Sequence, residues 1–163
     1  MDKKEFQAII DEYGQQLYGY LVRFLANRDD AEDILHDVFI SFYERIDRVD
    51  PDKYSSYLYR SAHNHAINFQ KKRGRHVGLS ESHISTLASD DESTGEEEEK
   101  NEEIRNALQE LKPKEMMVIE LKYFQNKSYE EIAEIMGNTS RAVDSLLVRA
   151  KKKLRKKMQG FES

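Results

Sequence analysis

The chain contains no cysteine and only two prolines among its 163 residues. The absence of cysteine excludes a disulfide framework, a thiol nucleophile and a cysteine zinc site, and it permits a reducing compartment. No apolar run approaches the roughly 18 residues that a membrane span needs, and residues 1–7 lack the hydrophobic region of a signal peptide. We therefore expect a cytoplasmic protein. Few prolines, with 38% apolar and 35% charged residues, favour a helical chain.

Charge is concentrated in one central stretch. Residues 79–104 contain ten acidic side chains and one basic side chain, and they are nearly without aromatic residues. Such a composition buries too little apolar surface to offset the entropy lost on ordering. We expect an all-α protein with two small helical domains, residues 1–75 and 103–163, joined by a flexible acidic linker, residues 76–102. Extended, that linker would reach about 90 Å, which exceeds the ~70 Å between two DNA sites two helical turns apart.

Residues 128–158 have the pattern of a helix-turn-helix. Ile132, Ala133 and Met136 form one apolar face, and Val143, Leu146 and Leu147 form another after a tight turn. We expect Ser128 and Glu131 to form a capping box, Gly137 to end the first helix in the left-handed conformation, and Thr139 or Ser140 to cap the second.

The second of these helices is strongly basic. Residues 139–157 contain eight Lys or Arg and one acid, Asp144, in a chain whose net charge is -5. A cationic segment on an acidic protein indicates a polyanionic partner, and the second helix of a helix-turn-helix reads the major groove while nearby cations neutralise phosphates. The candidate DNA-binding residues are Thr139, Ser140, Arg141, Asp144, Ser145, Arg149 and Lys152. Asp144 could accept a hydrogen bond from a cytosine amino group.

The N-terminal part predicts three amphipathic helices. Apolar residues recur at steps of three and four over residues 4–26, again over residues 29–46, and along residues 55–73. We expect Asp29 to cap the second helix with Glu32 at the capping-box position. The side of that helix opposite its apolar stripe carries Asp33, His36 and Asp37.

The third helix combines aromatic, amide and cationic residues. We expect its exposed side to carry Arg60, His63, Asn64, Asn68, Lys71, Lys72 and Arg73. Amides hydrogen-bond base edges and cations hold the backbone, so this composition is typical of surfaces that bind unpaired bases. A tyrosine stripe at helical spacing is more often part of a core, so the composition alone is only a weak indication of base binding.

Together these segments resemble the sigma-70 family of bacterial transcription initiation factors, in its minimal extracytoplasmic-function (ECF) branch. Residues 30–39 look like the family's second-region helix, and residues 57–64 with Lys71, Lys72 and Arg73 look like its helix for the promoter element near the start site. Residues 108–113, leading into 128–155, look like its fourth region, which reads the upstream element. Three such segments stand in the family's order.

The resemblance implies partners and roles. Asp33, His36 and Asp37 would dock on the clamp helices of the largest subunit of core RNA polymerase, and the C-terminal domain would contact its flap. The -10 element would be bound by Lys53, Arg60, Asn64, Asn68, Lys71, Lys72, Arg73 and Arg75, with the loop of residues 50–54 helping to capture a flipped base. The upstream, -35, element would be read by the helix-turn-helix residues named above. An anti-sigma factor, often at the inner face of the membrane, would control the protein; no cofactor, metal, small-molecule substrate or catalysis is implied.

Two other function classes compete with this one. A polymerase-independent helix-turn-helix regulator would bind a palindromic operator alone, but nothing in the sequence suggests the dimer that such sites require. A metal-dependent hydrolase could use His36 and Asp37 or His63 and His65. That interpretation fits poorly, because His63 and His65 lie on different faces of a helix and no acids complete a ligand set.

Overall fold

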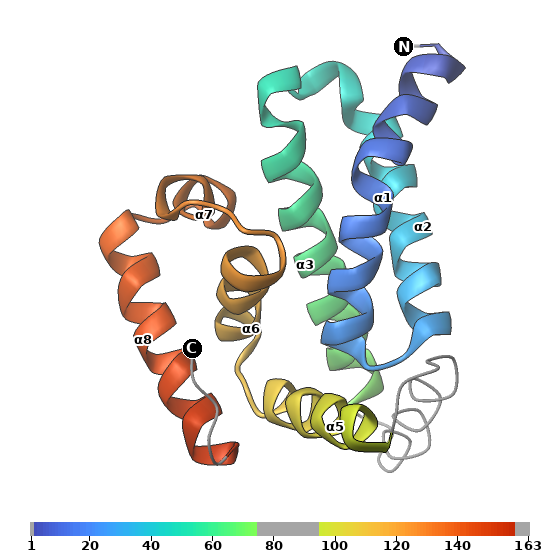
Figure 1. Cartoon of the computed structure of the whole chain (residues 1–163). Coiled ribbons are helices and arrows are strands. Elements are labelled where there is room, and N and C mark those ends of the chain that lie inside the picture. Colours follow the sequence, from blue (N-terminus) through green and yellow to red (C-terminus); the bar gives the residue numbers. More distant parts are fainter. Residues whose placement is uncertain (1, 75–94, 159–163) are drawn as a thin grey trace. The chain divides into compact units, whose positions relative to one another are not determined.

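The structure is a computed structural model that describes residues 2–74 and 95–158, all of which form helices or the turns between them (Figure 1). The chain divides into two compact units, Met1–Val77 and Gly78–Ser163. The all-α class expected from the sequence is confirmed, since the described residues form no strand.

The N-terminal unit is a three-helix bundle. Helices α1 (Lys3–Leu25), α2 (Arg28–Arg45) and α3 (Tyr54–Arg73) each pack on the other two, and two short 3₁₀ turns, η1 (Ile46–Arg48) and η2 (Pro51–Lys53), join α2 to α3. The 3₁₀ turn η2 lies within the segment expected to be a loop. The core consists of large, fully buried side chains from all three helices: Leu17, Tyr20, Leu21, Phe24, Val38, Phe42, Leu58 and Tyr59.

The N-terminus of α2 differs from the expectation. Asn27, not Asp29, is the capping residue, and its side-chain oxygen accepts a hydrogen bond from the Asp30 N–H at 2.9 Å. The reason lies in the preceding turn: Ala26 takes the left-handed conformation with φ 55° and closes α1. The chain therefore turns two residues earlier than expected, and α2 begins at Arg28.

The C-terminal unit contains α5 (Gly95–Gln109), α6 (Pro113–Ile119), a π-helical turn η4 (Glu120–Phe124), α7 (Tyr129–Met136) and α8 (Ser140–Lys157). Helix α8 packs on α5, α6 and α7. The start of α5 corrects the expected linker, because residues 95–102 are helical. Glutamate is a strong helix former, and acidic residues favour the N-terminal end of a helix. The remainder of the expected linker, residues 76–94, lies outside the described residues.

The π-helical turn at residues 120–124 was not expected from the sequence. Its wider winding carries the chain from α6 toward α7, and the turn closes where the Lys127 N–H donates to the Leu121 carbonyl at 2.9 Å after Asn126 takes a positive φ of 54°. Glu120 is buried there, and the Gln125 side chain donates to its carboxylate at 2.7 Å. The buried polar group is thus satisfied locally.

Candidate nucleic-acid interface

The turn of the helix-turn-helix has the expected geometry. The Ser128 hydroxyl accepts from the Glu131 N–H at 3.1 Å, and the Glu131 carboxylate accepts from the Ser128 N–H at 3.0 Å, which completes the capping box. The hydrogen bond that the Glu131 carboxylate accepts from the Ser128 N–H, and after it the one with the Ser128 side chain, favour the charged form and lower the pKa of Glu131. Gly137 takes φ 66° and ends α7, and Thr139 caps α8 by accepting from the Ala142 N–H. The turn is therefore fixed by local contacts.

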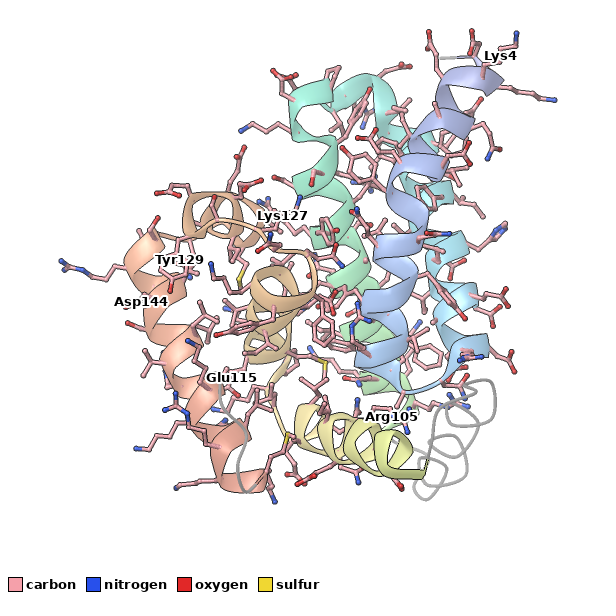
Figure 2. The ribbon with its side chains drawn as sticks, in the orientation of Figure 1. Lys4, Arg105, Glu115, Lys127, Tyr129 and Asp144 are labelled. Carbon is pink, nitrogen blue, oxygen red and sulfur yellow. The ribbon has the colours of Figure 1, made fainter. Side chains whose placement is uncertain are left out.

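Helix α8 presents a mostly polar face to solvent, interrupted by Val148, which is 59% exposed. Val143, Leu147, Ala150 and Leu154 are buried against the unit, which places the opposite side of α8 outward. Figure 2 shows Asp144 on the side of α8 that faces away from α6. The structure exposes every residue that the sequence assigned to this surface: Thr139, Ser140, Arg141, Asp144, Ser145, Arg149 and Lys152. We call this set the α8 face.

Cations at the other end of α8 have intramolecular partners. Lys153 Nζ pairs with Glu115 Oε1 at 2.8 Å, Lys157 Nζ lies 3.8 Å from Glu110 Oε1, and the Lys151 ammonium stands 5.5 Å from the centre of the Tyr123 ring. Arg141, Arg149 and Lys152 have no such partner within the described parts of the chain. Lys156 is likewise exposed without a partner there, so the charge available to a polyanion extends along the exposed side of α8 from Arg141 to Lys156.

Glu115 joins α6 to α8. Its side chain is 4% exposed, and its Oε1 accepts from the Lys112 N–H at the start of α6 as well as from Lys153, both at 2.8 Å. Burial raises the pKa of Glu115, but the hydrogen bonds from Lys153 and Lys112 and the two nearby ammonium charges outweigh it and hold the pKa below its ordinary value. This carboxylate therefore links the start of α6 to α8, beside the apolar contacts of α8. Sequence patterns could not have found it, since the partners lie 38 residues apart.

Helix α3 carries a second polar face. Arg60, Asn64 and Asn68 follow one another at steps of four, and all are exposed, as are Lys71 and Lys72 at the end of the helix. The rise of ~1.5 Å per residue makes the stretch from Arg60 to Lys72 about 18 Å long, the length of about five nucleotides of one strand. Lys53 is exposed in the turn that precedes α3. These six residues form what we call the α3 face.

Three residues assigned to this surface stand apart from it. His63 is buried, 6% exposed, because it faces the bundle; its Nδ1 lies 2.6 Å from the Tyr20 hydroxyl, and its ring contacts Phe24 edge-on. The expectation that His63 is exposed is therefore wrong. The Arg73 guanidinium forms an ion pair with Asp30. Arg75 lies outside the described residues.

The outward side of α2 is acidic. Asp33, His36 and Asp37 are exposed, as expected, on the side opposite the buried Ala31, Ile34 and Val38. Two apolar side chains continue this surface, because Ile40 is 46% exposed and Tyr43 is 54% exposed. The result is a surface with negative charge at one end and apolar area at the other.

Within residues 2–74 and 95–158, no three His, Asp or Glu side chains gather where they could hold an ion. Over the same part of the chain, no helix has both the length and the apolar character needed to cross a bilayer.

The C-terminal unit belongs to the helix-turn-helix class by its geometry, and comparison with known families is more specific. Residues 9–76 match the family model for sigma-70 region 2, and residues 101–154 match that for sigma-70 region 4. The ECF RNA polymerase sigma factor SigW of Bacillus subtilis is 31% identical, with 97% of this chain and 91% of SigW covered. The chain therefore belongs to the sigma-70 family, in its ECF branch, as its motifs indicated.

Other relatives agree with this assignment. RNA polymerase sigma factor SigV of Bacillus subtilis is 29% identical, with 90% of this chain and 86% of SigV covered. Among solved structures, the sigma factor RpoE in complex with the anti-sigma factor NepR from Bartonella quintana has a TM-score of 0.75 at 19% identity and covers 98% of this chain and 99% of that one. CnrH in complex with the cytosolic domain of CnrY has a TM-score of 0.69 at 20% identity. The match covers 95% of this chain and 88% of CnrH. The structural likenesses establish the fold.

Proposed function

We propose that this chain binds core RNA polymerase, directs it to promoters that carry matching -10 and -35 elements, and helps to open the DNA. The observation that carries the proposal is that each compact unit presents its own exposed polar face, the α3 face and the α8 face, within a segment that matches its own sigma-70 region. In this proposal the protein is an initiation factor and performs no catalysis of its own.

The α8 face suits the -35 element. It starts at the N-terminus of the second helix of a helix-turn-helix, the end that contacts base edges in the major groove. Arg141 can donate a hydrogen bond to guanine, and Asp144 can accept one from cytosine. Arg149 and Lys152 lie further along the same side of α8, where they can contact backbone phosphates.

The α3 face suits the -10 element after its strands separate. Asn64 and Asn68 are exposed one turn apart, so their amides can meet the edges of successive unpaired bases, and Arg60 lies one turn before them. Lys71 and Lys72 continue the face with positive charge for the backbone. Lys53 would add a contact from the turn before α3, and Arg75 is also proposed as a contact to the DNA backbone.

The acidic end of α2 suits polymerase docking. Asp33, His36 and Asp37 are exposed, and neither aspartate forms an ion pair within the described part of the unit. A basic helical surface, such as the clamp helices of the largest subunit, is complementary to them. The C-terminal unit would contact the flap. Polymerase would then hold the two units at the promoter's spacing.

Control by an anti-sigma factor is the regulatory part of the proposal. It is supported by two proteins of the same fold, RpoE and CnrH, which were solved in complexes with NepR and with the cytosolic domain of CnrY. The chain would act in the cytoplasm, where bacterial polymerase works, and an anti-sigma factor could hold it at the inner face of the membrane.

A binding experiment separates docking from DNA recognition. Asp33→Ala with Asp37→Ala should weaken association of the full chain with core polymerase by roughly tenfold or more, measured by fluorescence anisotropy of the labelled protein. Glu12→Ala, on the exposed side of α1, is the matched acidic control and should leave association unchanged. Equal affinity of the Asp33, Asp37 variant and the unmodified protein would refute the docking surface.

A further inference from the structure

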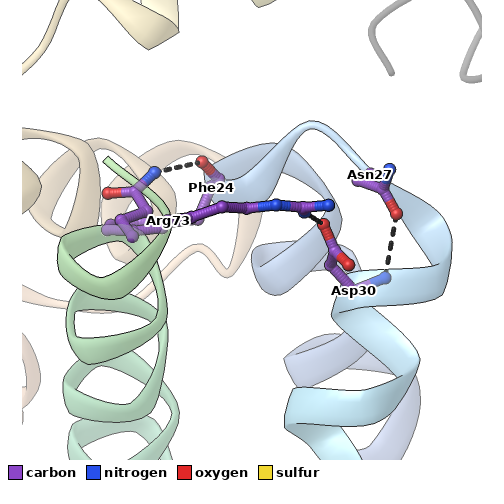
Figure 3. Close-up of polar contacts among 5 residues, drawn as sticks. Phe24, Asn27, Asp30 and Arg73 are labelled. Atoms are coloured by element: carbon purple, nitrogen blue, oxygen red, sulfur yellow. Dashed lines mark hydrogen bonds and ion pairs between the residues drawn. The ribbon is translucent and has the colours of Figure 1, made fainter. Parts of the chain in front are cut away.

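Two polar contacts fasten the last turn of α3 to the corner between α1 and α2 (Figure 3). The Gln70 side chain donates to the Phe24 carbonyl at 3.3 Å, at the C-terminal end of α1. The Arg73 guanidinium pairs with the Asp30 carboxylate in the first turn of α2. We call these two contacts the corner latch.

The corner that receives the latch is itself well fixed. Ala26 and Asn27 are each 6% exposed, and the Asn27 side chain holds the backbone N–H of Asp30, the residue whose carboxylate holds Arg73 (Figure 3). The guanidinium is also held from its own helix, because Arg73 lies 5.2 Å from the centre of the Phe69 ring. Arg73 is therefore anchored on two sides.

The burial of Asp30 makes it unfavourable for Arg73 to leave this ion pair and contact DNA. The Asp30 side chain is 16% exposed and that of Arg73 is 35% exposed. Moving the guanidinium to a DNA phosphate would leave a largely buried carboxylate without this partner, which is unfavourable. Lys71 and Lys72 are exposed and have no intramolecular partner among the described residues, so they can reach a phosphate at no such cost.

We propose that Arg73 is a positioning residue and not a DNA contact: through Asp30 it holds the end of α3 so that Lys71 and Lys72 face the backbone of the -10 strand. This rests on the proposed function for its DNA part. The sequence grouped Arg73 with the two lysines because the three cations are adjacent. The fold separates them, since the partner of Arg73 lies 43 residues away on another helix.

Salt dependence distinguishes a phosphate contact from a positioning residue. Holoenzyme made from core polymerase and the full chain is titrated with a promoter fragment that it transcribes, at several salt concentrations. Lys71→Ala and Lys72→Ala should each lower the slope of log affinity against log salt by about 0.7 to 0.9. Arg73→Gln should lower affinity roughly threefold to tenfold at every salt concentration and leave the slope unchanged.

Asp30→Asn is the matched variant, because it breaks the latch without touching a cation. It should reproduce the effect of Arg73→Gln, and the double variant should be no weaker than either single one. A slope that falls for Arg73→Gln as much as for Lys72→Ala would overturn the proposal. So would full affinity in Asp30→Asn beside a loss in Arg73→Gln, because Arg73 would then act without Asp30.

Hydrogen exchange tests the latch without DNA or polymerase. In the full chain, Arg73→Gln and Asp30→Asn should each speed amide exchange in residues 66–74, while Lys72→Ala should not. Unchanged exchange in the two latch variants would refute the latch. Unchanged salt slopes in both lysine variants would instead refute the DNA role of this part of α3, so the two failures are distinguishable.

Discussion

The Glu115→Gln substitution tests how α8 is held on its unit. Glutamine keeps the shape of the side chain, and its carbonyl oxygen can still accept from the Lys112 N–H and from Lys153 Nζ. It loses the negative charge, however. A hydrogen bond to a charged group contributes about 1.5–3 kcal/mol, against about 0.5–1.5 kcal/mol for a neutral one. Because Lys153 is 40% exposed and water screens its side of the pair, we expect a total loss of about 1–2 kcal/mol.

Hydrogen exchange at residues 108–125 of the full chain measures this loss locally. At pH 7 the amides of α6 should exchange roughly 5 to 30 times faster in Glu115→Gln than in the unmodified protein. Glu110→Gln is the matched control, since Glu110 is 58% exposed and lies 3.8 Å from Lys157, which is 54% exposed. Glu110→Gln should speed exchange of the same amides by less than about threefold. Equal effects of the two substitutions would refute the claim that burial makes the Glu115 pair important.

The same pair gives a pH dependence with a defined sign. The pKa of Glu115 in the folded protein lies below its ordinary value of 4.5, so its contribution to stability is complete above that value and is lost as the pH falls through the folded pKa. The unmodified protein and Glu115→Gln should therefore differ in free energy of unfolding by a constant amount from neutral pH to about 5.5. This difference should shrink below pH 4.5. An unchanged difference in free energy of unfolding below pH 4.5 would contradict a stabilising role for the charged Glu115 carboxylate.

Three further substitutions test other parts of the account. Asn64→Ala should slow promoter opening roughly tenfold in a permanganate-reactivity assay and spare polymerase association, with the exposed Asn106→Ala as control; a loss of association would contradict the division of roles. Arg141→Ala should reduce transcription from promoters that depend on the -35 element by roughly tenfold, and an unchanged promoter preference would refute its reading role. Tyr20→Phe removes the hydrogen bond to His63 and should lower the free energy of unfolding by about 1–3 kcal/mol in urea titration; a loss below ~0.5 kcal/mol would show that this bond is not stabilising.

Local features of this fold could be predicted well from the sequence. The Ser128 capping box, the left-handed Gly137 and the Thr139 cap each depend on residues within a few positions, and the structure confirms all three. The exposed side of α8 followed from the buried spacing of Val143 and Leu147. Such features are encoded by short-range chemistry, which a single sequence contains.

Features that depend on distant contacts could not be predicted. The Asp30–Arg73 and Glu115–Lys153 pairs join helices that are far apart in the chain, and no periodicity links them. His63 was misplaced because it lies between the buried Ala62 and the exposed Asn64, at the edge of the apolar stripe, where spacing does not decide which way a side chain faces.

The choice of cap for α2 failed for a related reason. Asn27 with Asp30 and Asp29 with Glu32 both fit the pattern of a capping residue followed by an acid, so the sequence offers two starts two residues apart. The left-handed turn at Ala26 selects the first. The π-helical turn at residues 120–124 likewise has no sequence signature that distinguishes it from an α-helix.

Transcription in vitro tests the central claim most directly. Core RNA polymerase would be incubated with a library of genomic DNA fragments, with and without the full chain, and the 5′ ends of the transcripts would be sequenced. We expect the chain to create a new set of start sites that share one pair of upstream sequence elements at a fixed spacing. Identical start sites with and without the chain would contradict the account.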